Sequence, residues 1–249
     1  MRLLRAWPSC FPVQIQTIRH SSSMFGSRFK PAETKKSSNV KSILHLNVSH
    51  GDKSLVTEGA KLFLSQLKFQ YSVHELSMWK EAPKIQYNLH HALAKMKILQ
   101  NTASQKDEEL FAPVLKAAEL INQVDVVLIS TPMWNYSVPY PLKQYIDTIV
   151  QPGVNFCDED QSSIEHLKGR HLIVFSSAGA MYDHGSHVQD FLNPYLGQVF
   201  KLMGFDRQEI VFIQGTSVRS REDLVKYTHD NAVRVAANVN EAFCDSNDK

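Results

Sequence analysis

The sequence predicts an α/β fold: a five-stranded parallel sheet with helices on both faces. Short apolar segments typical of buried strands recur along the 249 residues, and amphipathic segments with helical spacing separate them. This alternation implies right-handed βαβ units and a sheet that is covered on both sides. Five strands joined in this way favour the order 2-1-3-4-5, and a chain of this length fits a single main domain.

Five apolar or alternating segments predict the strands, at residues 42–48, 71–77, 124–130, 171–177 and 209–215. Segments of helical periodicity lie between and after them, at residues 53–69, 108–123 and 141–150, just before residue 204, and at 221–243. Residues 78–106 have only weak periodicity, which predicts a loop, a short helix and a polar linker.

Single residues mark several of these boundaries. Asp52 is a suitable N-cap for the helix after the first strand. Gly204 suits the end of the helix before the last strand, because glycine accepts the left-handed conformation that ends many helices. We expect a small strand or hairpin at residues 153–156. The predicted domain spans residues 42–245, and residues 1–41 lie outside it.

Residues 1–41 differ in charge from the rest of the chain. They hold eight Lys and Arg residues and one acid, which leaves 19 basic and 24 acidic residues in the remainder. Residues 1–32 have no acid and contain the cluster Ser21–Ser23. An acid-poor leader rich in Arg and Ser is typical of organelle transit peptides, so we expect a mitochondrial location. Plastid import and a plain cytoplasmic tail are the alternatives.

The bulk composition argues against several function classes. The predicted domain is mildly acidic, so nucleic-acid binding gains no electrostatic support. Cys10, Cys157 and Cys244 share no spacing typical of metal ligands or of a disulfide framework. No apolar run reaches the roughly 18 residues that a membrane span needs. We therefore expect no metal, no nucleic-acid partner and no membrane span.

Three loops with polar, aromatic or small residues follow predicted strands. Residues 49–54 precede a helix, where free amide N–H groups and the helix dipole favour an anion. Residues 131–136 offer rings and an amide to a flat aromatic ligand, and residues 176–185 let backbone approach a ligand closely. Taken singly, the first loop also fits a plain helix cap and the third a tight connection. Parallel strands share a carboxyl edge, so we expect the loops to converge there.

The stretch from Ser130 to Phe156 resembles the signature region of the FMN-dependent NADH:quinone oxidoreductases, also called FMN-dependent azoreductases, which have a flavodoxin-like fold. The matching residues are Pro132, Met133, Trp134, Asn135, Tyr136, Pro139 or Pro141, Leu142, Lys143, Tyr145, Asp147, Gly153 and Phe156. Residues 193–205 form another matching block, and the likeness extends from residue 42 to about residue 240.

The resemblance implies a set of residues that bind FMN. They are Ser49, Lys53 and Ser54 around the phosphate, Pro132, Met133, Trp134, Asn135 and Tyr136 at the isoalloxazine ring, and Ser177 and Gly179 at the far edge of the ring. Family members commonly have Ser where Asp52 stands. Two negative unit charges ~4 Å apart repel by roughly 4 kcal/mol at an effective dielectric of about 20, so this residue bears on phosphate binding.

Tyr182 stands where the family often has a His residue over the flavin. It is therefore the candidate catalytic residue, as a proton donor to the electron acceptor. His184 is an alternative donor, and a place at the rim of the pocket stays open for both residues.

The resemblance implies an enzyme that uses FMN to pass two electrons from NADH or NADPH to quinones or azo compounds. Donor and acceptor would bind in turn, in a ping-pong mechanism of two half-reactions, and two chains would form a homodimer. Two other functions stay open, a flavodoxin-type electron carrier and a flavin-less binding module of the same fold. The apolar loop at residues 134–141 suits a carrier weakly, and Asp52 is the main argument for the flavin-less module.

Overall fold

The structure is a computed structural model that describes residues 40–49, 51, 53–80, 87–157, 162–163, 167–182 and 188–244. All of them belong to one compact unit of the chain. The transit peptide predicted for residues 1–41 lies almost wholly outside the described residues, as do Asp52 and His184. None of the described helices has the length and the apolar composition that crossing a membrane requires.

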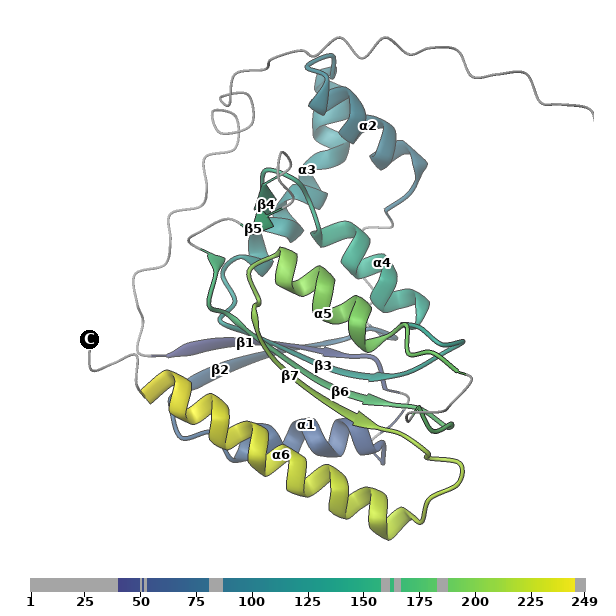
Figure 1. Cartoon of the computed structure of the whole chain (residues 1–249). Helices are drawn as coiled ribbons and strands as arrows, with labels where there is room; N and C mark the ends of the chain where they lie inside the picture. Colours follow the sequence, from purple (N-terminus) through teal and green to yellow (C-terminus); the bar gives the residue numbers. More distant parts are fainter. Residues whose placement is uncertain are drawn as a thin grey trace, which may run out of the picture. The chain divides into compact units, whose positions relative to one another are not determined.

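The five-stranded sheet is parallel throughout, and its order confirms the prediction (Figure 1). Its strands are β1 (Lys41–Asn47), β2 (Tyr71–Ser77), β3 (Val126–Pro132), β6 (His171–Ser177) and β7 (Arg207–Ile213). They lie in the order β2-β1-β3-β6-β7, which is 2-1-3-4-5 when the five are numbered along the chain. β2 and β6 have the bounds that the sequence predicts.

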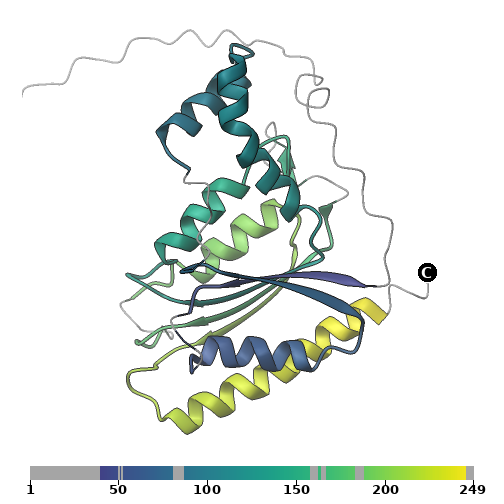
Figure 2. The ribbon, with the colours of Figure 1, turned by 180° about the vertical axis from the view of Figure 1, so that it is seen from behind.

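Helices cover both faces of the sheet. Figures 1 and 2 show α1 (Leu55–Ser65) and α6 (Arg221–Cys244) on one face, and α4 (Tyr140–Ile149) and α5 (Asn193–Leu202) on the other. The alternation of side chains along each strand supplies both faces with apolar residues. In β1, for example, Leu44 and Leu46 join the core on the α4–α5 side, and Ile43 joins the core under α1 and α6.

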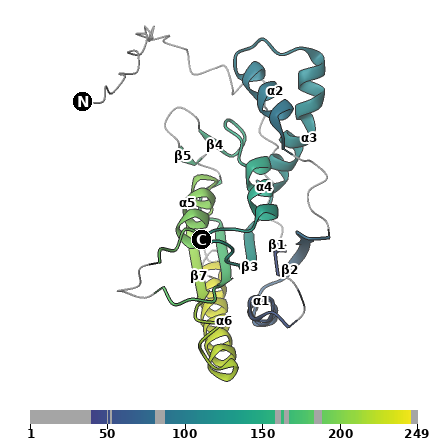
Figure 3. The same cartoon turned by 90° about the vertical axis from the view of Figure 1, so that its right-hand side faces the viewer.

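The segment before β3 forms a helical pair of its own. The short helix predicted within residues 78–106 is α2 (Leu89–Leu99), and it packs against α3 (Gln105–Ile121) through a small apolar cluster around Phe111. Figure 3 shows this pair beyond α4, on the side away from the sheet. α3 begins earlier than predicted because Ser104 and Asp107 form a capping box.

Most other boundaries differ from the prediction by a few residues, and three of these differences have a local cause. The N-cap of α1 is Ser54, whose extended backbone starts the helix at Leu55, and not Asp52. β3 continues to Pro132, where β1 no longer pairs with it and the missing N–H of proline removes no sheet hydrogen bond. β7 ends at Ile213 because Gly215 has a φ of 74°, outside the range of a strand.

The segment after α4 contains a strand pair that begins at Phe156, later than the small strand or hairpin predicted at residues 153–156. There β4 (Phe156–Cys157) pairs antiparallel with β5 (Ser162–Ser163) in a separate two-stranded sheet.

Candidate functional site

The three loops predicted to carry the chemistry leave the sheet at its carboxyl edge, and backbone hydrogen bonds join their first residues. The amide of Val48, after β1, donates to the carbonyl of Ser130 in β3 at 2.8 Å. The amide of Met133, after β3, donates to the carbonyl of Ser177 in β6 at 2.7 Å. The loops therefore begin side by side, as the parallel order requires.

A small cavity of about 320 Å³ opens where α1 begins. It is lined by Ser49, Gly51, Lys53, Ser54 and Pro132, so the first and second loops share it. The hydroxyl of Ser54 makes no capping hydrogen bond, although Ser54 is the N-cap. Among the described residues, no side chain therefore caps the first-turn amides of α1, and these amides and the helix dipole favour an anion.

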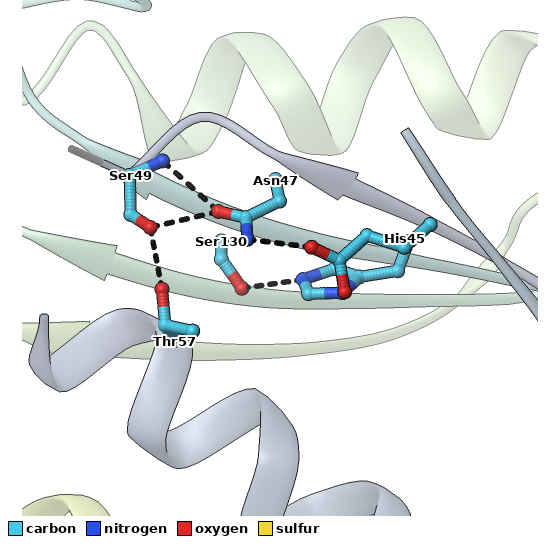
Figure 4. Close-up of polar contacts among 6 residues, drawn as sticks. His45, Asn47, Ser49, Thr57 and Ser130 are labelled. Atoms are coloured by element: carbon cyan, nitrogen blue, oxygen red, sulfur yellow. Dashed lines mark hydrogen bonds and ion pairs between the residues drawn. The ribbon is translucent and has the colours of Figure 1, made fainter. Parts of the chain in front are cut away.

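Ser49 is held by the protein itself in this arrangement (Figure 4). Its amide and its hydroxyl both donate to Oδ1 of Asn47, at 3.1 and 2.8 Å. Its Oγ also lies 2.5 Å from Oγ1 of Thr57 in the first turn of α1. Both donors of Ser49 are thus engaged within the protein, and the donors that remain at the cavity are the amides at the start of α1, the Ser54 hydroxyl and Lys53.

The second loop is a tight two-residue turn. Trp134 and Ser137 exchange both backbone hydrogen bonds, each at 3.0 Å. Between them Asn135 and Tyr136 have φ values of 47° and 68°. Positive φ at both central residues is the mark of a type I′ hairpin turn. It is unfavourable for a residue as large as Tyr, and such strain concentrates at functional sites.

Aromatic rings gather beside this turn. The Trp79 ring lies 5.1 Å from the Trp134 ring and 5.7 Å from the Tyr140 ring, measured between centroids. The indole N–H of Trp79 donates to the carbonyl of Val48 at 2.7 Å, which ties the rings to the first loop. Trp79 is not among the site residues that the sequence predicts. The one sequence feature that could have indicated it is its position just after the strand at residues 71–77.

A larger cavity of about 610 Å³ lies between the turn and α4. Its lining includes Trp134 and Asn135 from the turn and Tyr140, Lys143 and Asp147 from α4. The ammonium group of Lys143 lies 2.6 Å from the Asp147 carboxylate, so this wall carries a neutralised pair. A cavity with aromatic walls and few charges suits a flat, largely apolar molecule.

The third loop is held by backbone hydrogen bonds to the end of β7 and to the segment that follows β7. After Ser177, the Ala178 amide donates to the carbonyl of Ile213 at 3.0 Å, and the Gly179 carbonyl accepts from the Ser217 amide at 3.2 Å. A Cβ on Gly179 would stand 2.8 Å from Oγ of Ser217. A larger residue at this position would therefore require the Ser217 side chain to move.

Tyr182 lies at the end of the described part of the third loop. Its amide donates to Oε1 of Gln214 at 2.6 Å, and its ring lies 5.3 Å from the Phe212 ring. Burial raises the pKa of its phenol, and the nearby Tyr136 and Asp190 raise it further. The phenol is therefore protonated at neutral pH and close to the second loop, where it can donate a hydrogen bond or a proton.

Comparisons with known proteins agree with this architecture. A family model described as "Flavodoxin-like fold" matches residues 41–234. The chain is 32% identical over 183 residues to FMN-dependent NADH:quinone oxidoreductase 1 of Bradyrhizobium diazoefficiens, covering 70% of this chain and 87% of that protein. The chain belongs to the family of FMN-dependent NADH:quinone oxidoreductases.

Other members of the family extend the match. The FMN-dependent NADH:quinone oxidoreductase of Coprothermobacter proteolyticus is 28% identical over 203 residues, which covers 79% of this chain and 96% of that protein. With several further relatives of the same description, the match spans 52% to 58% of the relative's length. The crystal structure of an FMN-dependent NADH-azoreductase from Bacillus anthracis in complex with FMN shares the fold, with a TM-score of 0.69, 18% identity, and 80% and 99% of the two chains covered.

The family resemblance implied ten cofactor-binding residues, and the structure distributes them over one edge of the sheet. Those that line the smaller cavity are Ser49, Lys53, Ser54 and Pro132. Those that line the larger cavity are Trp134 and Asn135. Met133, Tyr136, Ser177 and Gly179 line none of the described cavities. The loops meet as predicted, but no described cavity contains residues of all three, and the roles of these residues toward FMN stay predictions.

Proposed function

We propose that this protein uses FMN to transfer two electrons from NADH or NADPH to quinones or azo compounds. Donor and acceptor bind in turn, in a ping-pong mechanism of two half-reactions. One observation carries the proposal: a cavity at the N-terminus of α1 and a strained aromatic turn lie at the same sheet edge. The first suits a phosphate and the second a flat ring, and the names of the relatives support the same cofactor and donor.

The first loop is the proposed phosphate site. The cavity there is lined by Lys53 and by Ser54 at the start of α1, which no side chain of the described residues caps. A phosphate dianion needs several N–H donors and a positive potential, and a helix N-terminus with a lysine supplies both. The amides at the start of α1, together with Lys53, are therefore suitable donors for the phosphate of FMN.

The second loop is the proposed site of the isoalloxazine ring. The two backbone hydrogen bonds between Trp134 and Ser137 leave the amide N–H groups of Asn135 and Tyr136 outside the pair. These N–H groups and the Asn135 amide are suitable donors for ring nitrogens and oxygens, and fixed dipoles of this kind stabilise added negative charge. Bound FMN supplies the redox chemistry, accepting a hydride and giving up two electrons.

Tyr182 is the proposed proton donor to the acceptor. Its phenol is protonated at neutral pH, as tyrosine ordinarily is, and burial and its neighbours raise its pKa further. The hydrogen bond from the Tyr182 amide to Gln214 and the contact of its ring with Phe212 fix Tyr182 beside the end of β7. The distance from the phenol to the substrate decides whether it acts, and Tyr182→Phe tests this through the pH dependence of kcat with a quinone.

The test of the proposal uses the purified full-length chain. The visible spectrum is recorded with and without added FMN, and NADH oxidation is followed with menadione as the acceptor. Bound flavin with multiple turnovers supports the reductase. Bound flavin without turnover would replace it by an electron carrier, and a protein that stays colourless in FMN would replace it by a binding module.

We also propose that two chains form a homodimer through the side that carries α2. Leu89, Leu93 and Met96 are 70%, 50% and 50% exposed, and their spacing places them on one face of the helix. An apolar stripe of this kind marks an interaction surface. Sedimentation velocity is expected to show a dimer that Met96→Glu weakens, while Val233→Glu, a matched exposed position on α6, leaves it intact.

We further propose that the leader directs the protein to mitochondria. The support is compositional, since residues 1–32 contain Arg and Ser but no acid. A fluorescent protein carrying residues 1–41 at its N-terminus should colocalise with mitochondria in a eukaryotic cell, and replacing Arg2, Arg5, Arg19 and Arg28 by Gln should abolish this. Diffuse fluorescence of the unmodified fusion would favour a cytoplasmic protein.

A further inference from the structure

A chain of polar side chains crosses the sheet on the side of α1. It begins with Ser130 on β3, whose Oγ lies 2.8 Å from Nε2 of His45 on β1. Nδ1 of His45 lies 3.3 Å from a carboxylate oxygen of Glu75 on β2. His45 is only 1% exposed and stands where the alternation of β1 would place an apolar residue against α1.

This chain of side chains continues from Glu75 through Asn47 to Ser49, which lines the candidate phosphate cavity. Figure 4 shows the contacts that join Asn47, Ser49 and Thr57. The other Glu75 carboxylate oxygen accepts a hydrogen bond from Nδ2 of Asn47 at 2.9 Å. Oδ1 of Asn47 accepts both donors of Ser49, and Ser49 Oγ meets Thr57 in the first turn of α1. One continuous set of contacts thus links three strands, the cavity wall and the helix N-terminus.

The carboxylate of Glu75 sets the direction of these hydrogen bonds. Partial burial raises the pKa of Glu75, but the hydrogen bond from Asn47 and the His45 ring outweigh it, so that the pKa is lowered overall. An ionised carboxylate only accepts hydrogen bonds, so it fixes the amide nitrogen of Asn47 toward itself. The amide oxygen must then face Ser49, which turns both Ser49 donors inward and leaves its oxygen to accept from Thr57.

The first three residues have the connectivity of a hydrolytic triad, Ser–His–acid, but not its accessibility. Ser130 is 0% exposed within the central part of the sheet, so no substrate carbonyl can reach its hydroxyl. A nucleophile must stand at a surface where the substrate and oxyanion donors meet it. The cluster therefore acts on the protein around it and not on a substrate.

We propose that Glu75 and Asn47 are positioning residues that hold Ser49 and the first turn of α1 in place for the phosphate of FMN, and that they thereby favour FMN over riboflavin. The proposal rests on the proposed function, because it assigns the cavity at Ser49 and Ser54 to the phosphate. A binding site whose donors are already fixed loses less conformational freedom on binding, so its affinity is higher.

Simple electrostatics makes the opposite prediction, which makes the proposal testable. Glu75 is a negative charge linked through one amide to the wall of an anion site. By Coulomb's law alone, removing this charge would strengthen the binding of a phosphate dianion. If the positioning role dominates, removing it weakens the binding of FMN and leaves riboflavin, which has no phosphate, nearly unaffected.

The experiment measures the dissociation constants of FMN and riboflavin by quenching of flavin fluorescence, with full-length proteins freed of flavin. The variants are Glu75→Ala, Glu75→Gln and Asn47→Ala. The matched control is Glu209→Ala, which also removes an edge-strand carboxylate that accepts from an asparagine, Asn238, at 2.6 Å. Circular dichroism and the thermal midpoint establish that each variant is folded.

We expect Glu75→Ala and Asn47→Ala to weaken FMN binding by about tenfold, the usual effect of losing a charge-assisted hydrogen bond. Riboflavin binding should change by less than about twofold. Riboflavin has no phosphate, so residues that act only on the phosphate site do not affect its binding. Glu75→Gln keeps an acceptor for Asn47 and should restore FMN binding to within about threefold of the wild type.

Unchanged or tighter FMN binding by Glu75→Ala overturns the proposal, and so do equal losses for FMN and riboflavin or a loss in Glu209→Ala of the same size. A failure of the proposed function would look different. In that case the wild-type protein itself would bind neither flavin, whereas the positioning role alone fails when the wild type binds FMN and the variants bind it equally well.

Discussion

The carboxyl edge and the amino edge of the sheet are formed by the two ends of the same strands, but their polar groups have different partners. At the carboxyl edge the Tyr136 ring is 52% exposed, and its backbone has a positive φ. At the amino edge the guanidinium of Arg170 donates to the carbonyls of Leu167 at 2.8 Å and Ile121 at 2.9 Å, and also to the carbonyl of Met203. Ile121 and Met203 stand at the C-terminal ends of α3 and α5, so this one side chain satisfies two helix ends.

This difference indicates that the amino edge contributes to folding stability and that the carboxyl edge can bind a ligand. At the amino edge, the Arg170 side chain satisfies the carbonyls of two helix ends, so these groups are not available to a ligand. The carboxyl edge keeps helix amides, rings and a strained turn available, and such features persist only because the rest of the structure supports them. Substitutions at the amino edge should therefore change the free energy of unfolding, and those at the carboxyl edge should change flavin binding.

The largest effect is expected for Arg170→Met at the amino edge. Methionine retains most of the volume but leaves the carbonyls at two helix ends without their donor, which costs roughly 3 to 5 kcal/mol of unfolding free energy. Urea denaturation measures this loss, and the flavin affinity of the folded protein should not change. Arg234→Met is the control, because its ion pair with Glu209 at 3.1 Å lies at the surface and contributes less than about 1 kcal/mol. Equal losses in the two variants would contradict the role of Arg170.

The next effect is expected for Ser54→Asp at the carboxyl edge. Aspartate is as good an N-cap as serine, so α1 and the stability should be retained. Its carboxylate would stand in the wall of the candidate phosphate cavity and repel the dianion, weakening FMN binding by on the order of 100-fold. Titration with FMN and with riboflavin measures the effect. A similar loss for both flavins would place the phosphate elsewhere.

A smaller effect is expected from pH at the amino edge. Burial, with help from Arg207, lowers the pKa of His171 to about 4, and its Nε2 has no hydrogen-bond partner in the described part of the chain. In the unfolded chain the pKa is about 6.5, so below that pH the unfolded state binds more protons and stability falls as pH falls. The loss reaches at most about 3 kcal/mol near pH 4. In His171→Leu the decline between pH 6.5 and 4 should be shallower, and an unchanged profile would exclude His171 as its source.

The smallest effect is expected for Tyr136→Gly, which tests whether the turn is strained. Glycine adopts positive φ without steric cost, so the unfolding free energy should rise by about 1 kcal/mol. FMN binding should weaken at the same time, because a ring is lost from the proposed flavin site. Thermal unfolding and flavin titration give the two numbers. A variant that is less stable than the wild type would show that the turn is relaxed.

Much of the fold could be predicted from the sequence because each strand carries its own signal. The strands at 71–77 and 171–177 have the predicted bounds, and the sheet order follows from regular alternation with helices. The convergence of the loops needed no further information, since parallel strands place their carboxyl ends together. The family resemblance then supplied candidate residues at that edge.

The missed features all depend on contacts that only the folded chain defines. His45 and Glu75 are far apart in the sequence and meet because β1 pairs with β2 in one register. Arg170 binds carbonyls 33 and 49 residues away, and neither partner has a side-chain signal. The strained turn could not be predicted either. Asn135 is a residue type that tolerates positive φ, but Tyr136 is not.

The most direct measurement is the ratio of two dissociation constants for the wild-type protein, that of riboflavin to that of FMN, at one pH and one salt concentration. If the start of α1 holds the phosphate, FMN binds at least about tenfold more tightly than riboflavin, since several charge-assisted hydrogen bonds depend on that group. Equal affinities for the two flavins would contradict a phosphate site at this edge of the sheet.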